Sequence, residues 1–233
     1  MDLSSSQINQ YLWTQSPLLW ITDNKIKNEK GELLEFKNHK FLKDIFDDWS
    51  PVQVVRKASQ VGFSTSIVLK TACAAHFKKY NIIYCLPTFN DVKQFVPTKV
   101  NQLIVNNPIL AKWTKDKDTI FQKQFNPGFI YYRGTFAQKT LDQKMEAGVG
   151  IILSADILAM DESDRSDQVI LEQYESRLDA STYKGKWYFS NPTTPFTLSQ
   201  RKWEESDQKH WFVKCPHCNE WQYLDFFKNI SYN

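Results

Sequence analysis

The sequence predicts an α/β protein whose mainly parallel sheet is flanked by helices. From Val52 onward, short apolar segments alternate with turns and longer amphipathic segments, which is the order of a parallel sheet covered by helices. Hydrophobic residues make up 42% of the chain and aromatic residues 15%, which is enough for a packed core in 233 residues. The composition therefore excludes a disordered or fibrous protein.

The individual elements follow from the apolar runs and from the residues that interrupt them. We expect strands at residues 52–55, 81–86, 128–133, 157–160 and 186–189, and helices that end near 79 and span 91–105, 168–178 and 198–206. Pro87 ends the second strand, because proline cannot continue a central ladder, and a kink is expected at Pro97.

Three regions are expected along the chain. Residues 1–40 are polar and mixed, which predicts a loosely structured lead-in. Residues 41–208 form the α/β core. Residues 209–233 form a small C-terminal extension, in which two short strands flank the sequence CPHC.

Charge and hydropathy narrow the class of protein further. The chain has 29 Lys and Arg against 26 Asp and Glu, and the net charge of +3 permits contact with nucleic acid without requiring it. The longest weakly polar stretch, residues 148–160, is interrupted by Ser154 and Asp156 and is too short to cross a bilayer. The N-terminus lacks a basic leader and an apolar region, so we expect a soluble protein that is not secreted.

The turn after the first strand carries the pattern of a phosphate-binding loop, with one departure. In such a loop, N–H groups at a helix start hold phosphate oxygens, a lysine reaches the β- and γ-phosphates, and a Ser or Thr hydroxyl holds Mg²⁺. Gly62 and Ser64 fit the pattern GxxxxGK[ST], but Phe63 stands where the lysine belongs. We predict that Lys57, at the front of the loop, brings its ammonium group to nearly the same place.

The predicted nucleotide-binding residues form one continuous window: Lys57, Ala58, Ser59, Gln60, Val61, Gly62, Phe63, Ser64 and Thr65. Taken alone, the window also fits an ordinary strand-to-helix turn with a capping serine and an incidental surface lysine.

Two adjacent carboxylates follow the predicted strand at 157–160. A nucleotide hydrolase needs one carboxylate at a strand end for Mg²⁺ and another to orient or deprotonate the attacking water. We predict that Asp161, with Ser64, holds Mg²⁺ and that Glu162 is the catalytic base. The alternative is an acidic helix N-terminus, since the helix dipole favours acidic residues there.

A polar turn follows the predicted strand at 186–189 and consists of Ser190, Asn191, Pro192 and Thr193. Strand ends of a parallel sheet line the ligand crevice, so hydroxyl and amide groups there can sense a γ-phosphate. An Asn-Pro turn that only ends the strand explains the same residues. The order of the loop, the acidic pair and this coupling turn favours a nucleotide site, because each closes a predicted strand.

Several segments, in this order, resemble the ATPase domain of tailed-phage terminase large subunits, in particular their lambda-like branch. The resemblance spans residues 38–226, and that branch also places the lysine at the front of the loop and an aromatic residue after the glycine. The segments are VVRKASQVGFS (54–64), NIIYCLPTFNDVKQF (81–95), YRGTFAQK (132–139), ADILAMDESDRSD (155–167), SNPTTP (190–195) and FVKCPHCNEWQYLDF (212–226).

The resemblance implies a P-loop NTPase core of the RecA-like type, which uses ATP and Mg²⁺ to drive double-stranded DNA into a procapsid. It also implies a homo-oligomeric ring on a portal protein, a small terminase subunit as partner, a monomer in isolation and a place in the host cytoplasm. Family members continue into a nuclease domain of the ribonuclease H type. Because this sequence stops at Asn233, we expect motor chemistry without cleavage. Upstream of the loop, a clean adenine-binding glutamine is not evident.

The remaining candidate functional residues are arginines, for catalysis, and two cysteines, for zinc binding. Phosphoryl transfer often uses an arginine to neutralise charge in the transition state. Arg133 is the first choice, supplied by a neighbouring subunit, ahead of Arg165 and Arg201. Cys215 and Cys218 are half of a four-ligand zinc site; because no second pair follows, a tight turn with two free thiols is favoured over zinc.

Two other functions stay open on the sequence. A nucleotide-dead module for assembly or DNA binding would explain Phe63 in the place of lysine and the modest net charge. A helicase-like ATPase would share the sheet, but it needs a second RecA-like lobe, for which the residues after Ser206 are too few.

Overall fold

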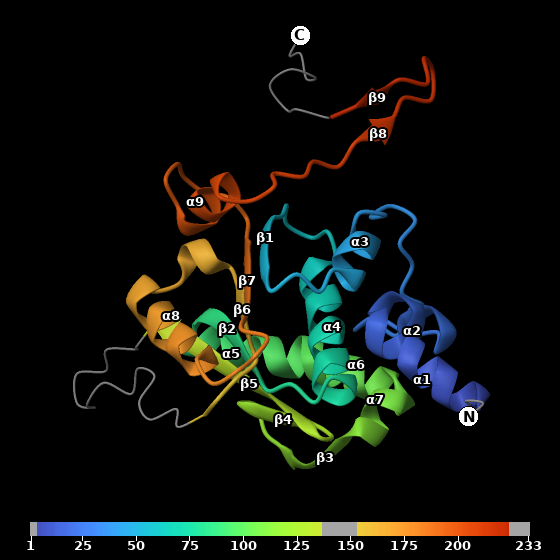
Figure 1. The fold of residues 1–233 in the computed structure, drawn as a ribbon, viewed down its shortest axis with the longest axis vertical. Coiled ribbons are helices and arrows are strands. Elements are labelled where there is room, and N and C mark those ends of the chain that lie inside the picture. Colours follow the sequence, from blue (N-terminus) through green and yellow to red (C-terminus); the bar gives the residue numbers. More distant parts are fainter. Residues whose placement is uncertain (1–3, 137–152, 224–233) are drawn as a thin grey trace.

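The computed structural model describes residues 4–136 and 153–223, and a sheet of seven strands lies at its centre in the order β1-β7-β6-β2-β5-β4-β3 (Figure 1). The strands of this sheet are β1 (Val52–Arg56), β2 (Ile82–Thr88), β3 (Thr114–Asp118), β4 (Gln122–Phe125), β5 (Gly128–Phe136), β6 (Ile157–Asp161) and β7 (Gly185–Ser190). A separate two-stranded sheet is formed by β8 (Val213–Lys214) and β9 (Trp221–Gln222).

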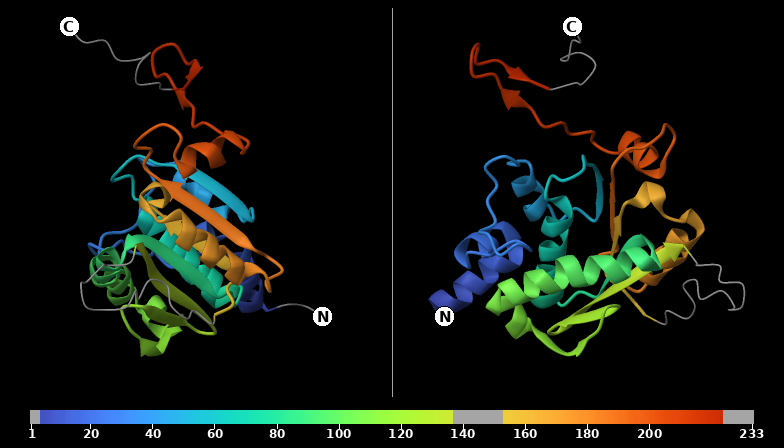
Figure 2. Two further views of the ribbon diagram at one scale, coloured as in Figure 1. Left: turned by 90° about the vertical axis from the view of Figure 1, so that its left-hand side faces the viewer. Right: turned by 180° about the vertical axis from the view of Figure 1, so that it is seen from behind.

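Helices cover both faces of the central sheet (Figures 1 and 2). The α-helices are α1 (Ser5–Gln15), α2 (Pro17–Asp23), α3 (Leu42–Asp47), α4 (Phe63–Phe77), α5 (Phe89–Phe95), α6 (Asn101–Asn106), α7 (Pro108–Trp113), α8 (Gln168–Glu175) and α9 (Leu198–Glu204). The short turns are the π-helical η1 (Val96–Val100) and the 3-10 helical η2 (Ser163–Arg165) and η3 (Ser176–Leu178).

The prediction of a mainly parallel sheet flanked by helices is confirmed. β1, β7, β6, β2 and β5 pair in parallel, whereas β4 and β3 extend the sheet antiparallel at one edge. This edge was not predicted, because the inward positions of β4 are Lys123 and Phe125 rather than two apolar residues. Lys123 is buried and pairs with Asp118 of β3, so a charged side chain occupies a core position.

Alternate residues of β2 divide between two cores. Ile82, Tyr84 and Leu86 pack with α4 and the N-terminal helices, whereas Ile83 and Cys85 pack with α8 on the opposite face. Because successive side chains of a strand point to opposite faces, burial on both sides produces a continuous apolar run. This is why the strand was recognisable in the sequence.

Residues 5–15 and 17–23 are helical, so the expectation of a loosely structured lead-in at residues 1–40 is wrong for this part of the segment. The side chain of Ser4 caps α1 in a capping box, and Pro17 occupies the first turn of α2, where it needs no N–H partner. Trp20 is fully buried and its ring lies 4.8 Å from that of Trp113. Trp20 belongs to α2, which also buries Pro17 and Ile21.

The helical path from α5 to α6 contains a change of helix type at Pro97, where a kink was predicted. Pro97 lies in η1, a π-helical turn that joins α5 to α6. Proline removes one backbone donor from a helix, and a π-turn is one way in which a helix continues past such an interruption.

The hairpin of β8 and β9 projects away from the main body, as Figure 2 shows, and a segment without regular structure joins it to α9. In the described parts of the chain, none of the helices has the length and apolar character needed to span a membrane.

Candidate active site

The three segments predicted to form the nucleotide site meet at the carboxyl ends of the parallel strands of the central sheet. β1, β7 and β6 are neighbouring parallel strands, so their carboxyl ends lie side by side. Arg56 at the end of β1 pairs with Ser190 of β7, and the next amide, that of Lys57, donates to the carbonyl of Ser190 at 2.9 Å. Asp161 closes β6 beside Phe189 of β7. The predicted loop, acidic pair and coupling turn are therefore adjacent.

Gly62 and Phe63 determine how the loop enters α4. Gly62 has a left-handed backbone with φ of 74°, which glycine adopts without the steric cost of a Cβ atom. Within residues 4–136 and 153–223, no side chain caps α4, so N–H groups of its first turn are left for a ligand. Phe63 is buried, and its ring lies 4.9 Å from that of Phe189. The position of the usual lysine is thus part of the hydrophobic core.

Lys57 reaches across the loop to the two carboxylates that follow β6. Its ammonium nitrogen lies 2.5 Å from Oε1 of Glu162 and 3.5 Å from Oδ1 of Asp161. The Lys57 side chain is only 7% exposed. An incidental surface lysine, which was the alternative interpretation, does not fit an ammonium group in this position.

Burial opposes the charge on Lys57, but its neighbours outweigh that effect. Desolvation lowers the pKa of the ammonium group, whereas the charges of Asp161 and Glu162 and the hydrogen bond to Glu162 raise it, and the net pKa is above the ordinary value. Because the folded-state pKa is raised, the stabilisation is fully present below the ordinary lysine pKa and is lost as the pH rises through the raised value. Lys57 is therefore charged throughout the neutral range.

Asp161 and Ser64 present oxygen atoms suited to Mg²⁺. The hydroxyl of Ser64 donates to Oδ2 of Asp161 at 2.8 Å, and Oδ1 of Asp161 is buried and accepts no hydrogen bond from the residues that the structure describes. Mg²⁺ is usually held by one or two carboxylates, a loop hydroxyl, water and substrate phosphates, so these atoms fit the metal. Among the described residues, no three His, Cys, Asp or Glu side chains form a metal site by themselves. A metal here would need phosphate and water to complete its ligands.

Tyr84 orients the carboxylate of Asp161 from the neighbouring strand β2. Its hydroxyl donates to Oδ2 of Asp161 at 2.9 Å, and the side chain is fully buried. Burial, and then the charge of Asp161, hold the pKa of Tyr84 well above its ordinary value, so the hydroxyl remains a donor. This contact was not predictable from the sequence, because Tyr84 occupies an ordinary core position of a buried strand.

The change Tyr84→Phe is expected to weaken Mg²⁺ binding by about tenfold, because a hydrogen bond to a charged group contributes roughly 1.5–3 kcal/mol. A titration of nucleotide binding against Mg²⁺ concentration measures this effect. Tyr132→Phe is the matched control, since Tyr132 is also fully buried but its hydroxyl has no hydrogen-bond partner in the described part of the chain. Equal effects of the two changes would show that Tyr84 only fills space.

Glu162 stands at an unusual turn beside a small cavity. Its φ of 57° is left-handed, a conformation that is uncommon outside glycine and clusters at functional sites. Ser64, Asp161 and Glu162 line this cavity together with the cationic residues Lys99 and Arg165. The cavity thus combines the candidate metal ligands, the candidate base and two positive charges, which are the groups that phosphoryl transfer uses.

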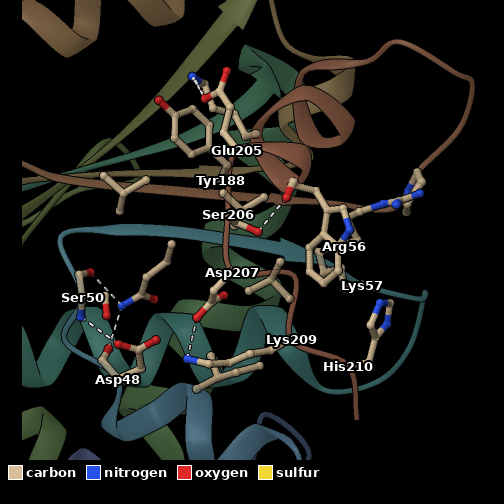
Figure 3. Close-up of a pocket in the computed structure, with 18 of the residues that line it drawn as sticks. Asp48, Ser50, Arg56, Lys57, Tyr188, Glu205, Ser206, Asp207, Lys209 and His210 are labelled. Atoms are coloured by element: carbon tan, nitrogen blue, oxygen red, sulfur yellow. Dashed lines mark hydrogen bonds and ion pairs between the residues drawn. The ribbon is translucent and has the colours of Figure 1, made fainter. Parts of the chain in front are cut away.

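A larger cleft lies along β1, between α3, α9 and the segment that follows α9 (Figure 3). Arg56, Tyr188 and Lys209 line it, and so do Ala58 and Val61 of the loop. The acidic pair after β6 does not line this cleft. Lys57 lines this larger cleft, whereas Ser64, Asp161 and Glu162 line the smaller cavity.

The coupling turn is bonded both to the loop and to the turn after β6. Nδ2 of Asn191 donates to the hydroxyl of Ser59 at 3.1 Å, and the amide of Asp164 donates to the hydroxyl of Ser190 at 3.2 Å. The carboxylate of Asp164 accepts the amide and hydroxyl of Ser199 at 2.7 and 2.6 Å, which ties the same turn to α9. The remaining residues of the turn, Pro192 and Thr193, are exposed.

The structure does not bring Arg133 to the cavity. Its guanidinium group donates to the carbonyls of Phe121 and Tyr132 at 2.7 and 2.9 Å and lies over the ring of Tyr131. Arg165 is exposed and lines the cavity instead. The role of Arg133 in a neighbouring subunit stays a prediction, because one subunit does not test it.

Cys215 and Cys218 lie at the turn between β8 and β9. The backbone N–H groups of Cys218 and His217, which donate to the thiol sulfur, lower the pKa of Cys215. Within the described ranges, no third ligand joins the two thiols in a metal site. Zinc binding stays untested.

The comparison with known proteins agrees with this arrangement. The family described as "Phage terminase large subunit gpA, ATPase domain" matches residues 40–233. The chain belongs to this family. The terminase large subunit of Escherichia phage lambda is 26% identical over 181 residues, a match that covers 74% of this chain and 28% of the lambda protein. No solved structure matches the chain.

Membership of the terminase ATPase family confirms the resemblance seen in the sequence segments, and the sheet has the architecture expected of it. The match covers little more than a quarter of the lambda large subunit, so the activities and partners of a whole terminase are proposals for this chain.

Proposed function

We propose that this terminase domain hydrolyses ATP with Mg²⁺ and that hydrolysis drives double-stranded DNA into a procapsid. The proposal rests chiefly on one observation: the ammonium group of Lys57 lies between Asp161 and Glu162, beside the uncapped start of α4. A cation, a pair of carboxylates and free helix N–H groups are the parts that recur in ATP hydrolases.

The proposed chemistry begins with an exchange of partners by Lys57. ATP phosphates bind the N–H groups at the start of α4, and Lys57 leaves Glu162 to contact them. Glu162, released from its ion pair, then accepts a proton from the attacking water. Asp161 and Ser64 would hold Mg²⁺, which neutralises phosphate charge when bound.

Force transmission is proposed to run through the coupling turn. Ser190 contacts the turn after β6, and Asn191 contacts the loop. Loss of the γ-phosphate would change the loop and the turn after β6, and with them the contacts of both residues. Asp164 passes the change to α9 through its two hydrogen bonds with Ser199. The coupling turn therefore contacts both segments that border the proposed nucleotide site, as a switch between nucleotide states requires.

The partners of the proposed motor are double-stranded DNA, a portal protein, a small terminase subunit and further copies of this chain. A net charge of +3 provides little sequence-independent grip on DNA by one subunit. Several subunits on one duplex would bind far more tightly than one, which is the reason to propose a ring on the portal and a weakly active monomer.

ATP turnover measured against protein concentration, with and without DNA, tests this proposal. Turnover per subunit is expected to rise with concentration and with DNA, and doping with Arg133→Ala should lower it more than in proportion if that arginine acts in trans. Arg165→Ala is the comparison for an arginine within the same subunit. Nucleotide binding without any turnover would favour the alternative of a module that does not hydrolyse ATP. High turnover in strict proportion to protein concentration would show that hydrolysis does not need a ring of subunits.

A further inference from the structure

Lys99 brings a second lysine ammonium group to the first turn of α4. Lys99 belongs to η1, and its Nζ donates to Oγ1 of Thr65 at 3.1 Å. Thr65 is buried and directly follows Ser64, whose hydroxyl binds Asp161. Lys99 also lines the cavity that contains Ser64 and Asp161. The start of α4 is thus approached by Lys57 from the loop and by Lys99 from η1.

Glu29 pairs with Lys99 on this same turn. Its Oε1 lies 2.7 Å from Nζ of Lys99, and its Oε2 accepts the hydroxyl of Thr65 at 3.0 Å. Burial raises the pKa of Glu29, but the hydrogen bond and charge of Lys99 outweigh this and leave the pKa below its ordinary value. The carboxylate is therefore charged at neutral pH.

The backbone around Glu29 is fixed by its neighbours. Nδ2 of Asn106 in α6 donates to the carbonyls of Asn28 and Glu29, each at 3.1 Å. The surrounding residues 26–34 form a tight hairpin, closed by a bridge between Lys27 and Leu33. The carboxylate of Glu29 is thus placed by the N-terminal segment, which is separate in sequence from the loop.

The start of α4 favours anions, and Glu29 already supplies one there. Uncapped N–H groups and the helix dipole give this turn a positive potential. Phosphate on the loop brings a second and more highly charged anion to the same turn, within reach of the Lys99 ammonium group. The two anions would compete for one cation.

We propose that Lys99 is a second phosphate-binding lysine of this site and that Glu29 holds it when no nucleotide is bound. This inference rests on the proposed function, because it needs ATP on the loop. When phosphate pairs with Lys99, the Glu29 carboxylate keeps only its hydrogen bond from the Thr65 hydroxyl. The contacts of residues 26–34 therefore depend on whether nucleotide is bound to the loop. Glu29 therefore opposes nucleotide binding, whereas Lys99 supports it.

The test is the dissociation constant of the 233-residue chain for Mg²⁺ and a non-hydrolysable ATP analogue, measured by calorimetry. Lys99→Met is expected to weaken binding by about tenfold, which corresponds to about 1.4 kcal/mol. Glu29→Gln is expected to tighten binding by about threefold, because Lys99 no longer leaves a charged partner. Lys99→Arg keeps the charge and should restore most of the affinity.

The controls separate this inference from a structural role and from the proposed function. Lys37→Met removes the same charge from an exposed ion pair with Glu35 and should leave binding unchanged. If Lys99→Met and Glu29→Gln both weaken binding and lower the melting temperature, the pair is structural and the inference fails. Parental affinity in Lys99→Met, with binding lost in Lys57→Ala, overturns this inference alone. No binding by the parent chain overturns the proposed function as well.

Discussion

Lys57→Ala is expected to reduce ATP turnover by at least about a hundredfold, since removing one pre-organised group that stabilises developing charge costs about 10²–10³ in rate. The ammonium group lies 2.5 Å from Glu162 and 3.5 Å from Asp161. Steady-state phosphate release at saturating Mg²⁺ and ATP measures the effect. Turnover at the parental rate would show that Lys57 does not replace the lysine that is missing from the phosphate-binding motif at position 63.

The same change also tests the fold, because Lys57 is a buried partner of two carboxylates and not a solvent-facing lysine. Breaking a buried ion pair by removing one partner leaves uncompensated charge and is destabilising. Thermal unfolding must therefore accompany the rate measurement, at a temperature where the variant is folded. Lys57→Arg, which keeps the charge, is the matched variant for stability.

Phe63→Lys, which restores the common motif, is expected to bring no gain in turnover. Phe63 is 2% exposed and packs against Phe189, so a lysine there would bury its charge in the core beneath the loop. Loss of the aromatic side chain alone costs about 3–5 kcal/mol. Two results together would contradict this explanation of the departure from the motif. The melting temperature of Phe63→Lys would equal that of the parent, and adding Phe63→Lys to Lys57→Ala would restore turnover.

The second large effect concerns the acidic pair, whose two members should fail in different ways. Glu162→Gln is expected to retain Mg²⁺-ATP but to lose turnover by about 10²–10⁴-fold, because an amide keeps the shape of the side chain but cannot accept a proton. Asp161→Ala should weaken the Mg²⁺-nucleotide complex itself, since it removes the carboxylate bonded to Ser64.

Binding and turnover must be measured separately for these two variants. Calorimetry with the ATP analogue, at several Mg²⁺ concentrations, gives binding, and phosphate release gives turnover. Glu162→Gln also removes the charge that holds Lys57, so its affinity for nucleotide should be at least parental. An equal loss of nucleotide affinity in both variants would argue against distinct roles.

The parallel sheet and the position of the site at its edge were predictable because their signals are local. Burial on both faces made the strand at Ile82 a continuous apolar run, and the acidic pair and the coupling turn each follow such a strand. The carboxyl ends of parallel strands lie on one side of a sheet and line the ligand crevice, so the loop and the acidic pair were expected on the same side. Strand order itself was not predicted from the sequence.

Features that depend on tertiary contacts were not predictable. Trp20 lies in the segment that was expected to be loosely structured, yet it packs in the core. Lys70 is fully buried, and its ammonium group donates to the carbonyls of Ile45 and Asp48 and lies 4.6 Å from the ring of Trp187. A lysine in a helix normally indicates a solvated face, and only the fold shows where its acceptors are.

The contacts that complete the site were missed for the same reason. Glu29 and Lys99 are 70 residues apart, and neither belongs to a recognisable motif. Their meeting at Thr65 depends on how the N-terminal hairpin and η1 pack around α4.

The role of Lys57 is tested most directly by a crystal structure of the chain with Mg²⁺, ADP and a fluoride analogue of the transferred phosphate. We expect Nζ of Lys57 to contact the analogue and no longer Glu162, Asp161 and Ser64 to lie at the metal, and the Glu162 carboxylate to face the attacking water. A structure in which the analogue is bound while Lys57 remains paired with Glu162 would show that Lys57 is not the phosphate-binding lysine of this site.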